Sequence, residues 1–439
     1  MSDPDWLADA HARLGARLRS DSPDPVVVAL SGGGDSVALL HLAADWARAH
    51  GRRLLALTVD HDLNPDSAGW TARAAAAARA LGADWRGLVW SGDKPATGLP
   101  AAARLARHRL IADAARQAGA RVILIAHTAD DRDEGELMRA EGSTLGRLRD
   151  WSPSPVWPEG RGLMLLRPLL SVRRAALRDW LTARGADWIE DPANDDLRYA
   201  RPRARKALAA GTRAPASQPG GPGRGVLGVR QDSIGLSRDV DARALSAALV
   251  CAGGGGRPPR GDRLAAVLSR LAAGEVFVAT LSGARIQADG ADVIVTREPG
   301  EFRRAAAPPL PLPSGVEVVW DGRWALTAPE PGWSVVPAAG RMASLSDADH
   351  AHLQALSAAA RGARPVLIRN APDAAVLAGE AFRAHALVEA RLASALDGMT
   401  HEDDLVAHAR GALPRKHLFS GVTSSSDGTR SRAEGTRRE

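Results

Sequence analysis

The chain has 439 residues, of which 45% are hydrophobic and 25% charged, as in a globular protein with room for two to four domains. Basic residues exceed acidic ones by 57 to 51, an excess too small to demonstrate nucleic-acid binding by itself. With a single cysteine, Cys251, intramolecular disulfides, Cys₄ zinc sites and Cys-ligated iron–sulfur clusters are excluded. No apolar run approaches the ~20 residues of a membrane span, and residues 1–20 lack the apolar core of a signal peptide. We therefore expect a cytoplasmic protein without a membrane partner.

The first half of the chain alternates short apolar runs with longer helical patterns. Strand patterns occupy 26–30, 54–59, 85–90 and 122–126, and helical patterns occupy 37–50, 67–81, 100–118 and a stretch from about 130. This alternation predicts right-handed βαβ units and an α/β fold with a doubly wound parallel sheet. Ligands of such sheets bind at the carboxyl ends of the strands.

The first strand runs directly into a glycine-rich loop, Ser31-Gly32-Gly33-Gly34-Asp35-Ser36. Consecutive glycines before a helix expose backbone N–H groups to which a phosphate can bind closely. Ser31 and Ser36 add hydroxyl donors, and the Asp35 carboxylate is suited to hold a magnesium ion on the same phosphates. The loop lacks the lysine and the spacing of a Walker A motif, so we predict a different kind of phosphate site.

Polar residues also follow the second and fourth strands. Asp60 and His61 end the second, and His127 to Asp131 follow the fourth. We expect these clusters to converge with the glycine loop in one crevice. An Asp-Asp pair at a helix start is as often a cap as a functional pair, and the histidines can be ordinary strand-end residues.

Beyond the sheet, a helical pattern at 172–184 is followed by a basic segment with Arg198, Arg201, Arg203 and Arg205. Glycine, proline and serine dominate 209–228, a composition typical of a flexible linker. Helical patterns at 239–250 and 262–272 and strand patterns at 275–281 and 292–296 then predict a small α/β module.

Several motifs together resemble one family, the tRNA(Ile)-lysidine synthetases, which belong to the N-type ATP pyrophosphatases of the PP-loop superfamily. The loop resembles their S-G-G-x-D-S element, and the resemblance covers roughly residues 26–206. The other matching segments are Val59-Asp60-His61-Asp62-Leu63, Ala103-Arg104-Leu105-Ala106-Arg107-His108, Ala126 to Glu134, Arg167-Pro168-Leu169-Leu170 and Glu190-Asp191-Pro192-Ala193-Asn194. The chain departs from the family pattern at Ala126, Arg132, Gly135 and His108.

The resemblance implies that ATP adenylates O2 of the wobble cytidine in an isoleucine tRNA with a CAU anticodon. Free L-lysine then displaces AMP, which gives lysidine. On this reading ATP binds at Ser31, Gly32, Gly33, Gly34, Asp35, Ser36, Asp60, His61 and His127, and the catalytic residues are Asp35, Arg107, Asp131 and Glu134. Asp131 and Glu134 flank the lysine ammonium, Mg²⁺ is held by Asp35 and Asp130, and Arg198, Arg201, Arg203 and Arg205 contact the tRNA.

The expected domain organisation follows from the composition and the resemblance together. It comprises a Rossmann-like PP-loop catalytic domain at 1–207, a flexible linker at 208–235, a small tRNA-binding α/β module at 236–300, a tRNA-binding C-terminal domain at 301–419 and a disordered tail at 420–439. The sequence leaves both a monomer and a homodimer open.

Two alternatives remain. A related tRNA thiolase would use paired cysteines, whereas Cys251 stands alone. A non-catalytic RNA-binding relative is disfavoured by the acidic residues Asp35, Asp131 and Glu134, although Arg132 and Gly135 keep it open.

Overall fold

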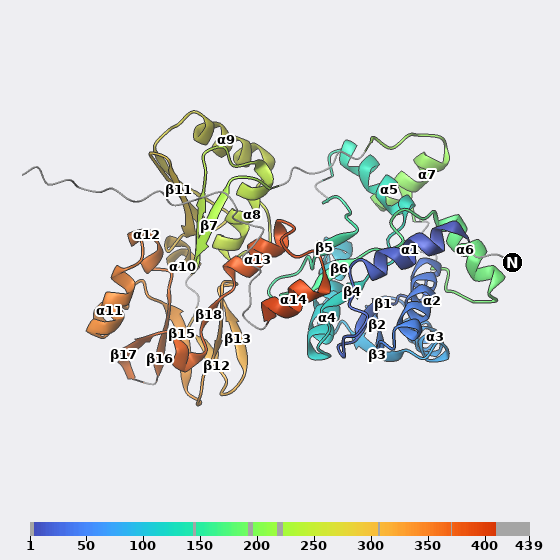
Figure 1. The fold of residues 1–439 in the computed structure, drawn as a ribbon, viewed down its shortest axis with the longest axis horizontal. Helices are drawn as coiled ribbons and strands as arrows, with labels where there is room; N and C mark the ends of the chain where they lie inside the picture. The colour runs from blue at the N-terminus through green and yellow to red at the C-terminus, as the bar shows by residue number, and fades with distance from the viewer. Residues whose placement is uncertain are drawn as a thin grey trace, which may run out of the picture.

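The computed structural model describes residues 4–409 except 144–145, 192–195, 217–222, 306–307 and 370, and it describes no side chains at 371–374 and 408–409. The tail predicted at 420–439 and residues 192–194 of the acidic motif lie outside the described residues. The N-terminal half forms one α/β body, and the C-terminal half forms two smaller β-rich units beside it (Figure 1).

The first body is built on a six-stranded sheet with the order β3-β2-β1-β4-β6-β5. Its strands are β1 (Val26–Ala29), β2 (Leu54–Asp60), β3 (Asp84–Val89), β4 (Val122–Leu124), β5 (Trp151–Pro153) and β6 (Met164–Leu166). All neighbours are parallel except the edge strand β5, which pairs antiparallel with β6. The chain first extends from β1 to β3 and then continues at β4 on the other side of β1, so a topological switch point lies between β1 and β4. The predicted doubly wound sheet is confirmed.

Helices cover both faces of this sheet because successive side chains of a strand point to opposite sides. Val26 and Val28 of β1 share a buried core with the helix that follows the glycine loop, whereas Val27 faces Ile111 and Ala115 on the other side. The helices are α1 (Asp5–Gly15), α2 (Gly34–Ala49), α3 (Ser67–Ala80), α4 (Leu99–Gln117), α5 (Ala129–Ala140), α6 (Arg174–Ala183) and α7 (Ala200–Ala209). Helices α1 and α7 have no counterpart among the elements predicted from the sequence.

The second unit is an antiparallel sheet with the order β7-β8-β11-β10-β9, covered by two helices. Its elements are β7 (Val226–Arg230), β8 (Ser233–Leu236), α8 (Ala242–Gly253), α9 (Gly261–Ala272), β9 (Phe277–Leu281), β10 (Ala284–Asp289) and β11 (Asp292–Arg297). The prediction of a flexible linker at 208–235 is therefore wrong over its last third, where β7 and β8 lie. Ile234 and Leu236 are fully buried against Leu245, and this alternating apolar pattern outweighs the glycine-rich composition around it.

The third unit contains a four-stranded sheet, β12-β15-β16-β17, and a three-stranded sheet, β13-β14-β18. Its elements are α10 (Gly300–Ala305), β12 (Leu310–Leu312), β13 (Glu317–Trp320), β14 (Trp324–Thr327), β15 (Trp333–Pro337), η2 (Met342–Ser344), α11 (Asp347–Gln354), α12 (Ala358–Arg361), β16 (Pro365–Arg369), β17 (Ala371–Leu377), η3 (Glu380–Phe382) and β18 (His385–Ala386). Arg323, immediately before β14, is fully buried and donates to Asp232 at 2.6 Å, which ties this unit to the β7–β8 turn.

The last two helices, α13 (Val388–Ala395) and α14 (Glu402–Ala409), return to the first body (Figure 1). Met399 and Leu405 belong to its core, and α13 also packs on α8. Glu402 pairs with Arg52 at 3.0 Å, with both side chains 1% exposed. The predicted single domain at 301–419 therefore needs correction, because its final segment is shared with the other two units.

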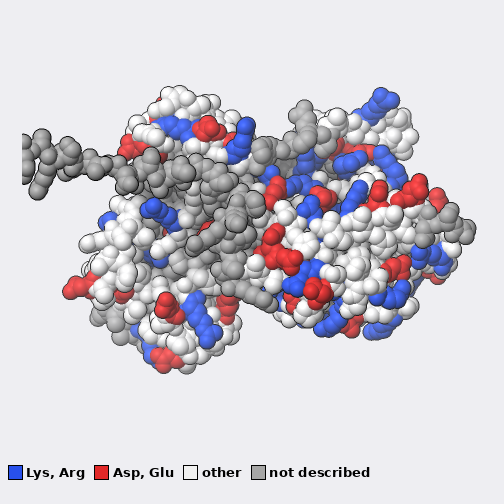
Figure 2. Space-filling model, viewed as in Figure 1, with Lys and Arg blue, Asp and Glu red and all other residues white. Residues whose placement is uncertain are grey.

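In the residues that the structure describes, every helix is too short or too polar to cross a membrane. Acidic and basic side chains alternate over the face in Figure 2, and basic side chains gather in the region of α5 and α7.

Candidate functional site

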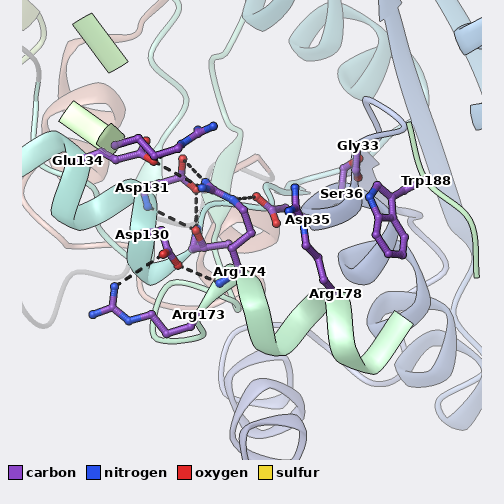
Figure 3. A network of polar contacts seen from close by, with 12 residues as sticks. Gly33, Asp35, Ser36, Asp130, Asp131, Glu134, Arg173, Arg174, Arg178 and Trp188 are labelled. Atoms are coloured by element: carbon purple, nitrogen blue, oxygen red, sulfur yellow. Dashed lines mark hydrogen bonds and ion pairs between the residues drawn. The ribbon is translucent and has the colours of Figure 1, made fainter. Parts of the chain in front are cut away.

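The glycine loop between β1 and α2 has a backbone shape that requires glycine. Gly32 has a φ of +87°, and a Cβ at this position would lie 2.5 Å from Cδ1 of Ile189. Trp188 lies beside the start of α2, where a Cβ on Gly34 would be 3.4 Å from its ring (Figure 3). The first N–H groups of α2 have no intrahelical acceptors, so Gly33 and Gly34 present a cradle for an anion.

Two serine hydroxyls hold the loop in this shape. The Ser36 hydroxyl is buried, donates to the carbonyl of Gly33 at 2.8 Å and accepts the backbone N–H of Ser31 at 3.2 Å. The hydroxyls of Ser31 and Ser36 are 3.1 Å apart. Ser36 is therefore a support of the loop, whereas the exposed Ser31 lies at its open side.

The aspartate of the loop faces an arginine that the sequence analysis did not single out. Arg174, at the first position of α6, donates from Nε to Asp35 at 3.0 Å. Burial raises the pKa of Asp35, although Arg174 opposes this shift. The same guanidinium lies 3.5 Å from carboxylate oxygens of both Asp131 and Glu134 (Figure 3). Arg174 thus joins the phosphate loop to the acids of α5.

The acids of α5 serve both the helix and the site. One oxygen of Asp131 accepts the N–H and the hydroxyl of Thr128, each at 2.9 Å, in a capping box. The other oxygen faces Arg174 and Arg201. Glu134 is 1% exposed, three residues further on the same face of the helix. Asp131 therefore caps α5 with one oxygen and faces the arginines with the other.

Asp130 occupies a different position from these two acids. Its carboxylate accepts the backbone N–H of Arg174 at 2.8 Å and lies 3.9 Å from Arg173 (Figure 3). It therefore caps the start of α6, where two adjacent arginines would otherwise oppose the helix dipole. The described residues contain no cluster of three metal-type donors, and the contacts of Asp130 are with Arg173 and the backbone of Arg174 rather than with the glycine loop.

The four arginines expected to contact tRNA divide into two pairs. Arg201 lies 3.4 Å from Asp131, and Arg205 donates to Glu134 at 2.9 Å, so both turn into the acidic cluster. Arg198 pairs with Asp196 on the exposed surface, and Arg203 donates to the carbonyls of residues 197 and 198. The geometry therefore leaves Arg198 and Arg203 at the surface and gives the other two a place in the site.

A second group of cations lies on the other side of Asp131. The cavity there has a volume of about 320 Å³ and is lined by His61, Pro100, Ala103, Arg104, Arg107, Asp131, Arg132, Gly135, Arg139, Gly146, Leu148 and Arg201. Burial, together with Arg104 and Arg201, lowers the pKa of Arg107 to about 10. A half-open, strongly basic cavity beside a carboxylate is suited to an anionic group.

Histidines around this cavity are held neutral. Burial and neighbouring arginines lower the pKa of His127 well below its usual value, and its Nδ1 accepts from Arg167 at 3.0 Å. The same causes lower the pKa of His108 to about 3 and also lower that of His61. Nδ1 of His61 is buried without a hydrogen-bond partner among the described residues. These rings are therefore polar neutral groups rather than cations.

Asp60, at the end of β2, shapes the loop that follows the strand. Its carboxylate accepts the N–H of Asp62 at 2.8 Å and the hydroxyl of Ser67 at 3.2 Å. His61 lies next to it and reaches the cavity that also contains Asp131. The ends of β2 and β4 thus border one cavity, and the loop after β1 is linked to Asp131 through Arg174.

Comparison with known proteins places this geometry in a family. A family model described as a PP-loop domain matches residues 8–211. The tRNA(Ile)-lysidine synthase of Caulobacter vibrioides is 52% identical over 369 residues, which cover 84% of this chain and 90% of that protein. The proteins of the same name from Mesorhizobium japonicum and Ruegeria pomeroyi are 36% and 35% identical, over 85% and 72% of this chain and 89% and 80% of their own lengths. The chain therefore belongs to the tRNA(Ile)-lysidine synthase family.

Proposed function

We propose that the protein joins the ε-amine of free L-lysine to C2 of the wobble cytidine in an isoleucine tRNA with a CAU anticodon. ATP activates O2 of the cytidine by adenylation with release of pyrophosphate, and lysine then displaces AMP. The observation that carries this proposal is the pair of buried carboxylates, Asp131 and Glu134, held by guanidinium groups beside a phosphate-binding loop. Such a pair can bind the ammonium group of an amino acid when one of these guanidinium groups gives way to it.

The phosphate end of ATP fits the loop at Gly32 to Ser36. Backbone N–H groups at the start of α2 stabilise the charge of the departing pyrophosphate. A magnesium ion fits here, because the half-buried carboxylate of Asp35 lies at the loop and phosphate oxygens supply further ligands. When bound, the ion neutralises phosphate charge during transfer of the adenylyl group.

The acceptor side of the reaction fits the basic cavity. Arg107, with its planar donor fork, and Arg104 line this cavity, and we expect them to bind the α-phosphate and keep it close to the cytidine. Asp131 and Glu134 hold one ammonium of lysine and so orient the other amine for attack on C2. His127 and His61 remain neutral and add no charge that would repel the cationic amino acid.

The alternatives fit the site less well. Cys251 is buried in the second unit, and burial raises the pKa of its thiol to about 11, which disfavours the thiolate that sulfur transfer needs. The non-catalytic alternative rests on Arg132 and Gly135, which depart from the family pattern and line the basic cavity. Arg132 adds a cation and Gly135 lacks a side chain, but neither removes the carboxylates of the site.

The test is to incubate the full chain with labelled lysine, ATP, Mg²⁺ and bulk tRNA. We expect lysine to enter tRNA only when ATP is present, with one AMP released for each lysine. ATP-dependent labelling of tRNA by another group, or binding of tRNA without any labelling, would contradict the proposal.

A further inference from the structure

Arg174 contacts both the phosphate loop and the carboxylates of the proposed lysine site. Its three guanidinium nitrogens face three carboxylates, with Nε on Asp35 and the two terminal nitrogens near Asp131 and Glu134 (Figure 3). Asp35 belongs to the phosphate loop, whereas the other two acids belong to the proposed lysine site. The side chain is 17% exposed, and its backbone is fixed by the bond to Asp130.

We propose that Arg174 couples the two sites, because it occupies the lysine-binding carboxylates until the phosphates of ATP draw it away. This inference rests on the proposed function. Without ATP, a lysine ammonium must compete with the guanidinium for Asp131 and Glu134. Bound ATP adds several negative charges at the loop, next to Asp35, and so gives Arg174 a stronger partner on that side.

The structure favours competition over simultaneous occupancy. Glu134 is 1% exposed and already contacts Arg205 at 2.9 Å as well as Arg174 at 3.5 Å. Both contacts are on Oε1, whereas Oε2 has no hydrogen-bond partner among the described residues and lies 3.6 Å from Arg201. A lysine ammonium at Oε2 would therefore stand among three guanidinium groups, and like-charge repulsion disfavours that arrangement unless one of them moves away. The acids raise the pKa of Arg174 against the effect of burial, so the residue remains charged and cannot yield the site by losing its proton.

Coupling of this kind is reciprocal. If ATP raises the affinity for lysine by some factor, lysine raises the affinity for ATP by the same factor. We expect a factor of about ten, within the range of roughly 5- to 150-fold that is common for coupled sites.

The experiment measures binding of labelled lysine to the full chain by equilibrium dialysis, with and without a non-hydrolysable ATP analogue and Mg²⁺. Wild-type protein should bind lysine about tenfold more tightly when the analogue is present. Arg174→Ala should bind lysine without the analogue about as tightly as wild type does with it, and the analogue should then have little further effect. Arg174→Lys should lose most of the coupling, because one ammonium cannot contact three carboxylates as the guanidinium does.

The matched control is Arg173→Ala, which removes the same charge from the adjacent position. Arg173 is 59% exposed and pairs with Asp133 at 2.7 Å. This variant should keep the coupling of wild type. If Arg174→Ala does not fold, loss of coupling in Arg174→Lys tests the same inference, and coupling of wild-type size in that variant would contradict it.

Two results would overturn the inference. One is equal lysine affinity of wild type with and without the analogue, and the other is weaker lysine binding by Arg174→Ala in both conditions. A wild-type protein that binds no lysine in either condition would instead contradict the proposed function, so the two failures can be distinguished.

Discussion

Replacing Glu134 by glutamine tests the assignment of the lysine site with little change in volume. Glu134 is 1% exposed and lies within 3.6 Å of Arg174, Arg201 and Arg205. The substitution removes the negative charge that these three cations share. In the proposed complex the same charge faces the lysine ammonium, so its loss should weaken lysine binding directly.

The size of the effect follows from the type of interaction. A hydrogen bond to a charged group contributes roughly 1.5–3 kcal/mol, which corresponds to about a ten- to hundredfold rise in the lysine concentration required. Removing one partner of a fully buried ion pair destabilises proteins by about 3–5 kcal/mol. Here the loss should be smaller, because Arg201 and Arg205 are each 36% exposed and can turn to solvent.

The assay is steady-state formation of lysidine with lysine and ATP varied separately. Glu134→Gln should raise the KM for lysine about ten- to hundredfold and leave the KM for ATP nearly unchanged. Asp133→Asn is the matched control, because Asp133 lies on the same helix but pairs with the exposed Arg173. A rise in the KM for ATP with an unaltered KM for lysine would refute the reasoning and assign Glu134 to the phosphate side.

Three further predictions concern the fold, the pH dependence and the RNA surface. Glu402→Gln should lower the free energy of unfolding by about 3–5 kcal/mol in urea titrations, because it leaves Arg52 buried without its ion-pair partner, and neither KM should change. With a folded-state pKa of about 3, His108 stays neutral in the folded protein while the unfolded chain takes up a proton below about pH 6.5, so stability falls as the pH falls. His108→Phe should reduce this loss by up to about 1.4 kcal/mol per pH unit, measured as unfolding free energy between pH 6.5 and 4.5. Arg198→Ala should weaken tRNA binding and make its salt dependence shallower without affecting the KM for lysine, whereas Arg205→Ala should change that KM. The reverse pattern would contradict the assignment of Arg198 to the RNA surface and of Arg205 to the lysine site.

The features that the sequence predicts well are those set by local patterns. The apolar run before Ser31, the glycines that follow and the helical pattern after them suffice to predict a strand, a phosphate loop and a helix. Asp131 and Glu134 are similarly local, because a spacing of three residues at a helix start places them on one face.

The role of Arg174 depends on the packing of α6 against α2, which the sequence does not reveal. Its contact with Asp35 joins residues 139 positions apart in the chain. One signal was available, because Arg173 and Arg174 stand at a helix start where positive charge opposes the helix dipole. Two such residues at that position require nearby carboxylates, and Asp130 and Asp35 provide them.

The C-terminal half shows where composition misleads. Glycine and proline between 209 and 228 predicted a linker, yet β7 begins at Val226 within this range. The pairing of Arg52 with Glu402 spans 350 positions and could not be read from either segment alone. The sequence therefore does not predict that α14 returns to the first body. Met399 and Leu405 belong to the core of that body, so a truncation in the linker region, for example after Gly228, would remove part of it.

The central claim is tested most directly by identifying the modified nucleoside. Isoleucine tRNA with a CAU anticodon, transcribed without modifications, is incubated with the protein, ATP, Mg²⁺ and lysine, then digested to nucleosides and analysed by mass spectrometry. We predict that the cytidine at the wobble position gains the mass of lysine less one water, and that a methionine tRNA with the same anticodon gains nothing. An unmodified wobble cytidine in the isoleucine tRNA, or a mass change that corresponds to another group, would contradict the account.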